Sequence, residues 1–357
     1  DGVGETVSQT IASDGSSAAE IGRRIRGSQE PFDGYISNLR VVKGTALYTS
    51  NFTPPTEPLT NVTNTKLLCC QSKTSATAAA VTPGNITANG DAYAKDYNPF
   101  DIYRVDGRVY ATAAEAGLNG GTITPTGASV NTESGFSIIT YTGDGNTSSG
   151  VTINHGLGDT PAFIITKKRS SGTTDNGWSC WHKDLGGNYG IWLNLTNTRN
   201  PSMWGGHTNI SSTVFSPPDL NYGNENGQTY VNYLWSEVPG FSKFGTYTGN
   251  GAVNGPLIEC GFRPAWVMVK VAGGSTGNSW TVWDNKRDPD NEMNLYLHPN
   301  ETQDDGSYSA IKMDFYSNGF KPRGDIIHQN TDGTMYIYVA FAEAPTFNLY
   351  GGQANAR

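Results

Sequence analysis

The sequence predicts an all-β protein in which several small domains follow one another. Gly occupies 44 and Pro 18 of the 357 positions, and so many turn-forming residues favour short strands over long helices. Apolar residues make up only 36% of the chain, yet 8 Trp, 18 Tyr and 13 Phe supply aromatic surface that disordered chains lack. A third observation is an internal repeat, described below. A chain of this length is long enough for about two to four domains.

The charge balance excludes some classes of partner. The formal charge is −8 and the pI is about 5.1, and Lys and Arg cluster only in the short runs GRRIR and KKR. Phosphate contacts need a basic face, so we expect no nucleic-acid binding. No apolar run approaches the roughly 18 residues of a membrane-spanning helix, so we expect no membrane insertion.

Four cysteines indicate a reducing environment. Cys69, Cys70, Cys180 and Cys260 form no C-x-x-C pair, and neighbours in a strand point to opposite faces and cannot easily bridge. We therefore predict four free thiols in a protein that folds in the cytosol.

Two strands are expected after a small, polar stretch at residues 1–30. The segment YISNLRVV, residues 35–42, alternates with period two, and TKLLCCQS, residues 65–72, predicts a second strand. The segment FTPPTEP between them is a proline-rich crossing that cannot be central in a sheet.

Residues 73–100 are rich in Ala, Thr, Asn and Gly and predict a linker, and we place a linker with one short helix at 73–125. Thr112 is placed to cap this helix and Glu115 stands three residues later, as in a capping box. Asn119 or Gly120 would end it.

The second half of the chain repeats itself. YTGDG at 141–145 matches YTGNG at 247–251, PAF at 161–163 matches PAW at 264–266, and the block closing at 239 matches the block closing at 345. The order is the same and the spacing is nearly constant, which indicates a tandem duplication. Four tryptophans recur at strand spacing, which favours core packing for them: Trp178, Trp181, Trp280 and Trp283.

Each repeat reads as five or more short strands in about a hundred residues, which predicts a β-sandwich. We place the first repeat at 126–240, the second at 241–347 and a tail at 348–357. An alternative is that both repeats share one larger sandwich.

Two stretches resemble known families. The segment FDGYISNLRVVKGTALYTSNFTPPTEPLTNVTNTKLL is similar to the closing strands of the laminin-G/concanavalin-like jelly rolls of phage virion proteins, which assigns residues 1–72 to the end of such a jelly roll. The tandem unit, with YTGxG, HGLGxxPAFIIxK, EVPGFSKFGTYTGNG and YIYVAFAEAP, resembles a domain common in marine phage structural proteins. The chain departs from the first pattern because only the end of the jelly roll is present. Either the upstream half is missing or neighbouring chains supply its strands.

The resemblance implies a non-enzymatic structural protein of a bacteriophage particle, exposed on the virion surface. A tail fibre or similar appendage that attaches to host-surface glycan is the expected role, with a homo-oligomer, by analogy a trimer, and other virion proteins as partners. The alternative is a capsid decoration or knob protein with purely structural contacts. A glycan depolymerase is a third possibility, and it requires two carboxylates that face each other across a groove.

Loop aromatics are the candidate ligand-binding residues. Trp204 and His207 lie in NPSMWGGHTN and Tyr222 lies in PPDLNYGNENG. Both loops are polar and Gly-rich, and they have no clear counterpart in the second repeat. Sugars stack on aromatic faces and bond to polar side chains, so these three residues are predicted to contact ligand.

Other chemistry is weakly indicated. Asp284, Asp288 and Asp290 in DNKRDPDNE are oxygen ligands that suit Ca²⁺, but the loop lacks the EF-hand pattern. The five histidines show no metal-ligand spacing, and His155 is expected to bond backbone in a turn. The spacing of Asp184, Asp219, Glu225 and Glu237 selects no catalytic pair, and Glu237 recurs as Glu343, which favours a structural role for both.

Overall fold

The computed structural model describes residues 21–22, 32, 34, 36–55, 57–90, 92–94, 102–147, 150–170, 177–204, 209–274, 277–303 and 305–343. Within these ranges the chain consists of strands joined by turns, which confirms the all-β class. None of the helical turns in this part of the chain has the length or apolar composition needed to cross a membrane. The chain divides into two compact units, Asp1–Asp101 with Val109–Ala111 and the remainder.

The first unit contains a small antiparallel sheet of order β1-β2-β3. Its strands are β1 (Leu39–Val42), β2 (Thr65–Cys69) and β3 (Ala79–Val81). The predicted strand at 35–42 is therefore shorter than expected, because Asn38 adopts φ 63° and its side chain accepts a hydrogen bond from the Leu59 N–H. Tyr35 lies outside the described residues. The second predicted strand is confirmed and ends where Cys70 adopts φ 60°.

The four cysteines are free thiols, as predicted. The sulfur atoms of Cys69 and Cys70 lie 3.5 Å apart without a bond. Burial, aided by the neighbouring Cys70 thiol, raises the pKa of Cys69 to about 12.

The segment predicted as a linker holds three strands rather than a helix. Besides β3, residues 73–125 contain β4 (Tyr103–Val105) and β5 (Arg108–Tyr110). The expected cap is present, since the Glu115 N–H donates to the Thr112 hydroxyl. The helix prediction is wrong because Gly117 adopts φ 71° and ends the chain reversal after a single turn.

The first repeat is built on an eight-stranded sheet of order β11-β10-β9-β13-β7-β6-β4-β5. The further strands of this sheet are β6 (Gly127–Asn131), β7 (Phe136–Thr142), β9 (Pro161–Lys168), β10 (Ser179–His182), β11 (Ile191–Trp192) and β13 (Thr229–Ser236). A two-stranded sheet pairs β8 (Ile153–Asn154) with β12 (Val214–Phe215). A 3₁₀ turn, η1 (Lys183–Leu185), follows β10, and a π-helical turn, η2 (Leu220–Asn224), precedes β13.

The second repeat reproduces this plan with fewer strands. Its larger sheet has the order β14-β20-β16-β17, and the smaller has the order β15-β19-β18. Their bounds are β14 (Ser242–Thr248), β15 (Ile258–Glu259), β16 (Trp266–Val271), β17 (Thr281–Asp284), β18 (Met313–Tyr316), β19 (Gly319–Pro322) and β20 (Met335–Phe341). The larger sheet matches β7-β13-β9-β10 strand by strand. The pair Ile258–Phe320 also matches the pair Ile153–Phe215, so the duplication seen in the sequence is a duplication of topology.

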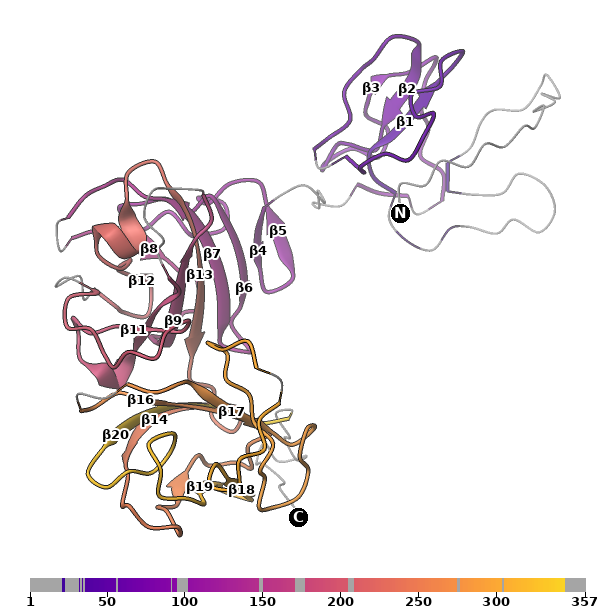
Figure 1. Ribbon diagram of the computed structural model, residues 1–357. Helices are drawn as coiled ribbons and strands as arrows, with labels where there is room; N and C mark the ends of the chain where they lie inside the picture. The colour runs from indigo at the N-terminus through magenta and orange to yellow at the C-terminus, as the bar shows by residue number, and fades with distance from the viewer. Residues whose placement is uncertain are drawn as a thin grey trace. The chain divides into compact units, whose positions relative to one another are not determined.

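The two repeats share a hydrophobic core. One buried cluster joins Phe163, Ile165 and Cys180 of the first repeat to Met268, Val282 and Val339 of the second. These residues occupy equivalent strands, so the same face of each large sheet packs against the other. Figure 1 shows β14, β20, β16 and β17 against the strands of the first repeat, with β18 and β19 beyond them. Both repeats lie in the same compact unit.

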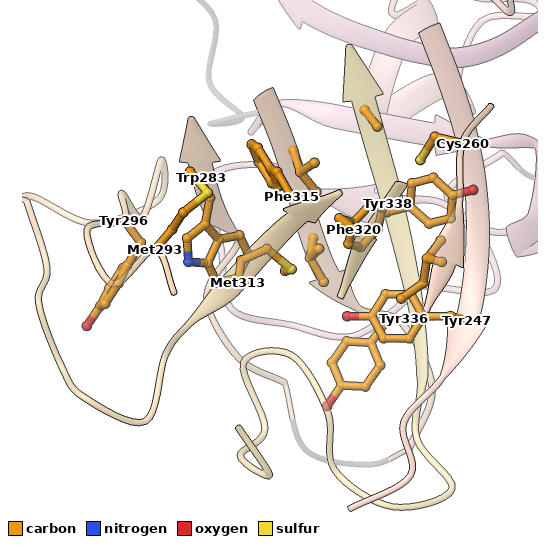
Figure 2. Packing of buried hydrophobic residues seen from close by; sticks show 14 of the residues in the cluster. Tyr247, Cys260, Trp283, Met293, Tyr296, Met313, Phe315, Phe320, Tyr336 and Tyr338 are labelled. Carbon is orange, nitrogen blue, oxygen red and sulfur yellow. The ribbon is translucent and has the colours of Figure 1, made fainter. Parts of the chain in front are cut away.

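The opposite face of the second repeat's large sheet has a core of its own (Figure 2). This cluster packs Trp283 against Met293, Met313 and Phe315 and places Phe320 against Tyr338. Alternation along the strands explains the two cores, because successive side chains point to opposite faces. The recurring tryptophans accordingly pack in the interior: Trp181, Trp280 and Trp283 are buried and Trp178 is half-buried.

Candidate functional site

The repeated YTGxG motif is a structural clasp. In the first repeat the Tyr141 hydroxyl donates to the Gly223 carbonyl, and in the second the Tyr247 hydroxyl donates to the Gln329 carbonyl at 2.6 Å. The glycine after each Tyr-Thr pair is required, because a Cβ at Gly143 or Gly249 would overlap a backbone carbonyl of the facing loop. The motif therefore recurs because each repeat has to fasten the same loop.

A buried asparagine completes the clasp in both repeats. Asn224 accepts from the Asp144 N–H at 3.2 Å and donates to the Asp144 carboxylate at 2.8 Å. Asn330 makes the equivalent bonds with Asn250, both at 2.9 Å. The polar side chains of the most recognisable motif are thus used to hold loops in place.

The structure corrects the prediction for Trp204. Its side chain is completely buried, and the indole N–H donates to the Ser216 carbonyl at 3.1 Å. The ring lies directly against Gly190, where a Cβ would be 2.8 Å from it. A buried indole offers no face for a sugar. Trp204 is therefore a core residue, although the sequence around it is polar. The predicted His207 lies outside the described residues.

Tyr222 remains a candidate, with a partner that the sequence analysis missed. It lies in η2, is half-buried, and meets the half-buried Trp192 of β11 edge to face, with the ring centroids 5.3 Å apart. Asn194, two residues after Trp192, is exposed, and its side-chain oxygen accepts from the Trp178 N–H. The signal that could have indicated Trp192 is its place directly after Ile191 in one strand, because successive strand residues point to opposite faces. Two rings and an amide at one edge are the elements of a sugar-stacking surface.

The Trp192–Tyr222 ring pair has a counterpart in the second repeat, contrary to the prediction that Tyr222 has none. Cys180 faces Ile191 as Val282 faces Leu297, so Trp192 is equivalent to His298. The clasp carbonyls of Gly223 and Gln329 are equivalent, so Tyr222 corresponds to His328. His298 and His328 are stacked with centroids 5.0 Å apart. Each repeat therefore carries a ring pair at the same place, Trp192–Tyr222 in the first and His298–His328 in the second.

The His298–His328 ring pair is partly tied to the backbone. His298 Nδ1 lies 2.7 Å from the Trp280 carbonyl, so Nδ1 carries the proton. His328 Nδ1 is buried without a hydrogen-bond partner in the structure. Burial and the neighbouring His298 lower the pKa of His328 to about 4, which keeps that ring neutral at physiological pH.

The candidate calcium loop is organised by its own hydrogen bonds. The Asp284 carboxylate accepts from the Lys286 and Arg287 N–H groups and pairs with the Arg287 side chain. The Asp288 carboxylate accepts from the Asn294 N–H at 2.7 Å, and Asp290 is exposed. Among the described residues, no three His, Cys, Asp or Glu side chains form a group that could hold a metal ion. The three aspartates are thus not assembled into a site.

Three of the four acidic residues considered for hydrolysis have structural partners: Asp219, Glu225 and Glu237. Asp219 caps η2, and Glu225 pairs with the buried Lys168 at 2.5 Å. Glu237 accepts from the Phe244 N–H at 3.0 Å and lies 3.1 Å from Lys183, and these bonds lower its pKa although burial acts in the opposite direction. The recurring Glu343 pairs with Lys286. Glu237 thus holds neighbouring main chain, whereas Glu343 forms an ion pair between exposed side chains.

His155 bonds backbone in a turn, as predicted. Its Nδ1 accepts from the Leu157 N–H at 3.1 Å, and its Nε2 lies 3.1 Å from the Ser211 carbonyl. Burial lowers the pKa of this ring to about 4. The imidazole is a neutral linker between two loops.

Comparison with known proteins places the duplicated region in one family. No curated protein and no solved structure matches the chain. A family model described as a domain of unknown function, DUF7483, matches residues 74–345, which includes both repeats and their shared core. The chain therefore belongs to the DUF7483 family.

Proposed function

We propose that this protein is a non-enzymatic structural component of a phage particle, exposed on its surface as a tail fibre or similar appendage, and that it binds host-surface glycan through the Trp192–Tyr222 ring pair. The resemblance of residues 30–72 and of the tandem unit to phage virion proteins supports the particle assignment. The contact between the half-buried Trp192 and Tyr222 rings, 5.3 Å apart at the edge of a sheet, is the observation that carries the binding role.

The hydrogen bonds and ion pairs of the polar side chains support a scaffold role for this protein. The Tyr141 and Tyr247 hydroxyls, together with Asn224 and Asn330, hold loops. Carboxylates such as Glu237 are shared among lysines and main chain. Groups engaged in this way stabilise loops, and loops on a rigid scaffold are where binding residues are commonly displayed.

The small first unit supports assembly with other chains, for which a trimer is the proposal. Among the residues described between 36 and 94, only Leu68 and Cys69 are buried hydrophobics, whereas Val41, Leu47 and Tyr48 are exposed. Three strands of 4, 5 and 3 residues with so little core are marginal by themselves. Neighbouring copies or other virion proteins would supply the missing cover. Light scattering after gel filtration measures the stoichiometry, and a stable monomer would contradict this part of the proposal.

An apolar stripe beside the shared core favours a second candidate, the capsid decoration protein. Phe136 and Ile138 of β7 lie beside Tyr233 and Trp235 of β13, all four are half-buried, and Tyr233 and Trp235 also pack against the shared core. The Phe136 and Trp235 ring centroids are 4.9 Å apart. Such a stripe on a sheet suits contact with another protein better than contact with a sugar.

Two double variants separate these functions. Trp192→Ala with Tyr222→Ala removes the first ring pair, and Phe136→Ala with Trp235→Ala removes an aromatic pair of similar separation from the stripe. Binding to intact candidate host cells and to their isolated surface glycans is measured for both, with folding checked by circular dichroism and by protection of the buried Cys180.

The expected result is loss of cell and glycan binding in the Trp192/Tyr222 variant only. If instead only the Phe136/Trp235 variant loses binding, and the binding that it loses is to other virion proteins, capsid decoration becomes the better-supported function. Release of reducing sugar from the glycan by the wild-type protein would contradict the non-enzymatic role and favour a depolymerase.

A further inference from the structure

The contact between the two repeats contains a buried histidine. His182 ends β10, is completely buried, and its ring meets Phe163 edge to face with the centroids 6.1 Å apart. Its Nε2 lies 3.3 Å from the main-chain carbonyl of Tyr338 in β20. His182 therefore joins the edge of the first repeat's sheet to the central part of the second repeat's sheet.

Both ring nitrogens of His182 have a role that fixes the neutral form. The Asp184 N–H donates to Nδ1 at 3.2 Å, so Nδ1 is an acceptor and the proton is on Nε2, facing the Tyr338 carbonyl. The bond at Nδ1 is also the cap of η1. Adding a proton to Nδ1 would place two N–H groups against each other, and it would break the cap at the point where the repeats meet.

The carboxylate that acts on the ring, Glu237, is already paired with two lysines. The charged and titratable groups around it are Lys183 and Asp184 of η1, Glu237 of the connection between the repeats, Lys243 of β14 and Tyr338 of β20. Glu237 lies 3.1 Å from Lys183 and 3.4 Å from Lys243, so this carboxylate is already shared. Desolvation lowers the pKa of His182 from 6.5 to about 4, and Lys183 acts in the same direction.

We propose that His182 is an acid-sensitive latch: its protonation releases β10 from β20, breaks the cap of η1 and opens the edge of the first repeat locally. The released segment is near the sheet edge, since only the two-residue β11 lies beyond β10. Local opening of an edge exposes far less apolar surface than separation of the shared core. The rest of both repeats therefore stays folded while the latch is open.

The sign of the pH dependence follows from linkage. The open segment has a solvated imidazole with an ordinary pKa of about 6.5, and the closed ring titrates at about 4, so the open form binds more protons between these values. The opening equilibrium therefore rises by up to about tenfold per pH unit as the pH falls from 6.5 to 4.

The chain contains its own reporters for this opening. Cys180 lies in β10, two residues before His182, in the shared core, whereas Cys260 lies in the separate core of the second repeat, and both are buried. Labelling of the full chain with 4,4′-dithiodipyridine, which reacts with thiols in acid, followed by peptide mass spectrometry, measures the two sites separately. In the wild-type protein Cys180 is expected to become reactive as the pH falls from 6.5 to 4, while Cys260 stays protected.

The matched variants are His182→Asn and His155→Asn. An Asn at 182 keeps an oxygen that can cap η1 but has no ionisable ring, so Cys180 should lose its acid response. His155 has the same bonding pattern, with Nδ1 on Leu157 and Nε2 facing Ser211, but it lies wholly within the first repeat. Its variant should leave the Cys180 response unchanged.

Three outcomes would overturn the proposal. The first is a joint gain of reactivity at Cys180 and Cys260 in the wild type, which means global unfolding. The second is an acid response of Cys180 that persists in His182→Asn, which means that another group titrates. The third outcome is that wild-type Cys180 stays protected down to pH 4. The first and third are read on the wild-type protein, so the test stands even if a variant fails to fold.

Discussion

Lys270 is a lysine held in a buried environment between the two repeats. Its side chain is completely buried, and its ammonium donates to the backbone carbonyls of Leu195 at 3.3 Å, Thr196 at 3.0 Å, and Asn278. The first two belong to the first repeat, so a single charge of the second repeat fastens a loop of the first. The equivalent Lys167 in the first repeat is half-exposed.

Lys270 predicts a rise in stability with pH. Burial lowers its pKa from 10.5 to about 8, so between these values the unfolded chain holds a proton that the folded chain has lost. The free energy of unfolding should therefore rise with pH, by at most about 1.4 kcal/mol per unit, relative to Lys270→Met. Urea unfolding from pH 8 to 10 measures this difference. Burial raises the pKa values of Tyr141 and Tyr247 well above 10, and their opposing effect above pH 10 is shared by both proteins.

Lys167→Met is the matched control for that experiment. The Lys167 ammonium lies 5.8 Å from the Trp178 ring, as Lys270 lies 5.9 Å from Trp280, but its side chain reaches solvent. Its removal should shift stability by a similar amount at each pH. If the free energy of unfolding changed with pH in the same way in the wild type and in Lys270→Met, Lys270 would keep its proton from pH 8 to 10.

At the scale of elements, the clasp allows one experiment to be done twice in the same molecule. Asn224→Ala and Asn330→Ala each remove a buried amide that bonds to the facing turn. Each is expected to lower the free energy of unfolding by about 2–3 kcal/mol, because several buried partners lose their bonds. The exposed Asn294→Ala should change it by less than about 0.5 kcal/mol. A loss confined to one repeat would show that the clasps are not equivalent.

The strands were predictable from the sequence, whereas the site residues were not. Apolar runs that begin after a turn and recur in the same order located β9 and β16, because apolar runs and turn signals are local properties of the chain. Trp204 was misjudged because its burial depends on Gly190 and Ser216, which the loop sequence does not reveal. The match between Tyr222 and His328 depends on the clasp carbonyls of the residues that follow them, and the two side chains share little beyond a planar ring.

At the scale of the whole molecule, the shared core makes the two repeats one folding unit at neutral pH. Phe163 contacts Phe244 and Trp280 across the repeats, with ring centroids 6.3 and 6.5 Å apart. Equivalent faces of equivalent sheets are thus buried against each other within a single chain. Neither repeat can lose this contact without exposing a large apolar face of the other.

One cooperative transition is therefore expected for both repeats. In urea at pH 7.5 the labelling of Cys180, in the shared core, and of Cys260, in the core of the second repeat, should show the same midpoint. Phe163→Ala and Phe315→Ala remove buried rings from the shared and the separate core respectively. Each should lower the free energy of unfolding by about 3–5 kcal/mol and lower the urea midpoints of both cysteines together. If Phe315→Ala moved the Cys260 midpoint alone, the repeats would be independent domains in contact, and the shared core would be an interface rather than the centre of one fold.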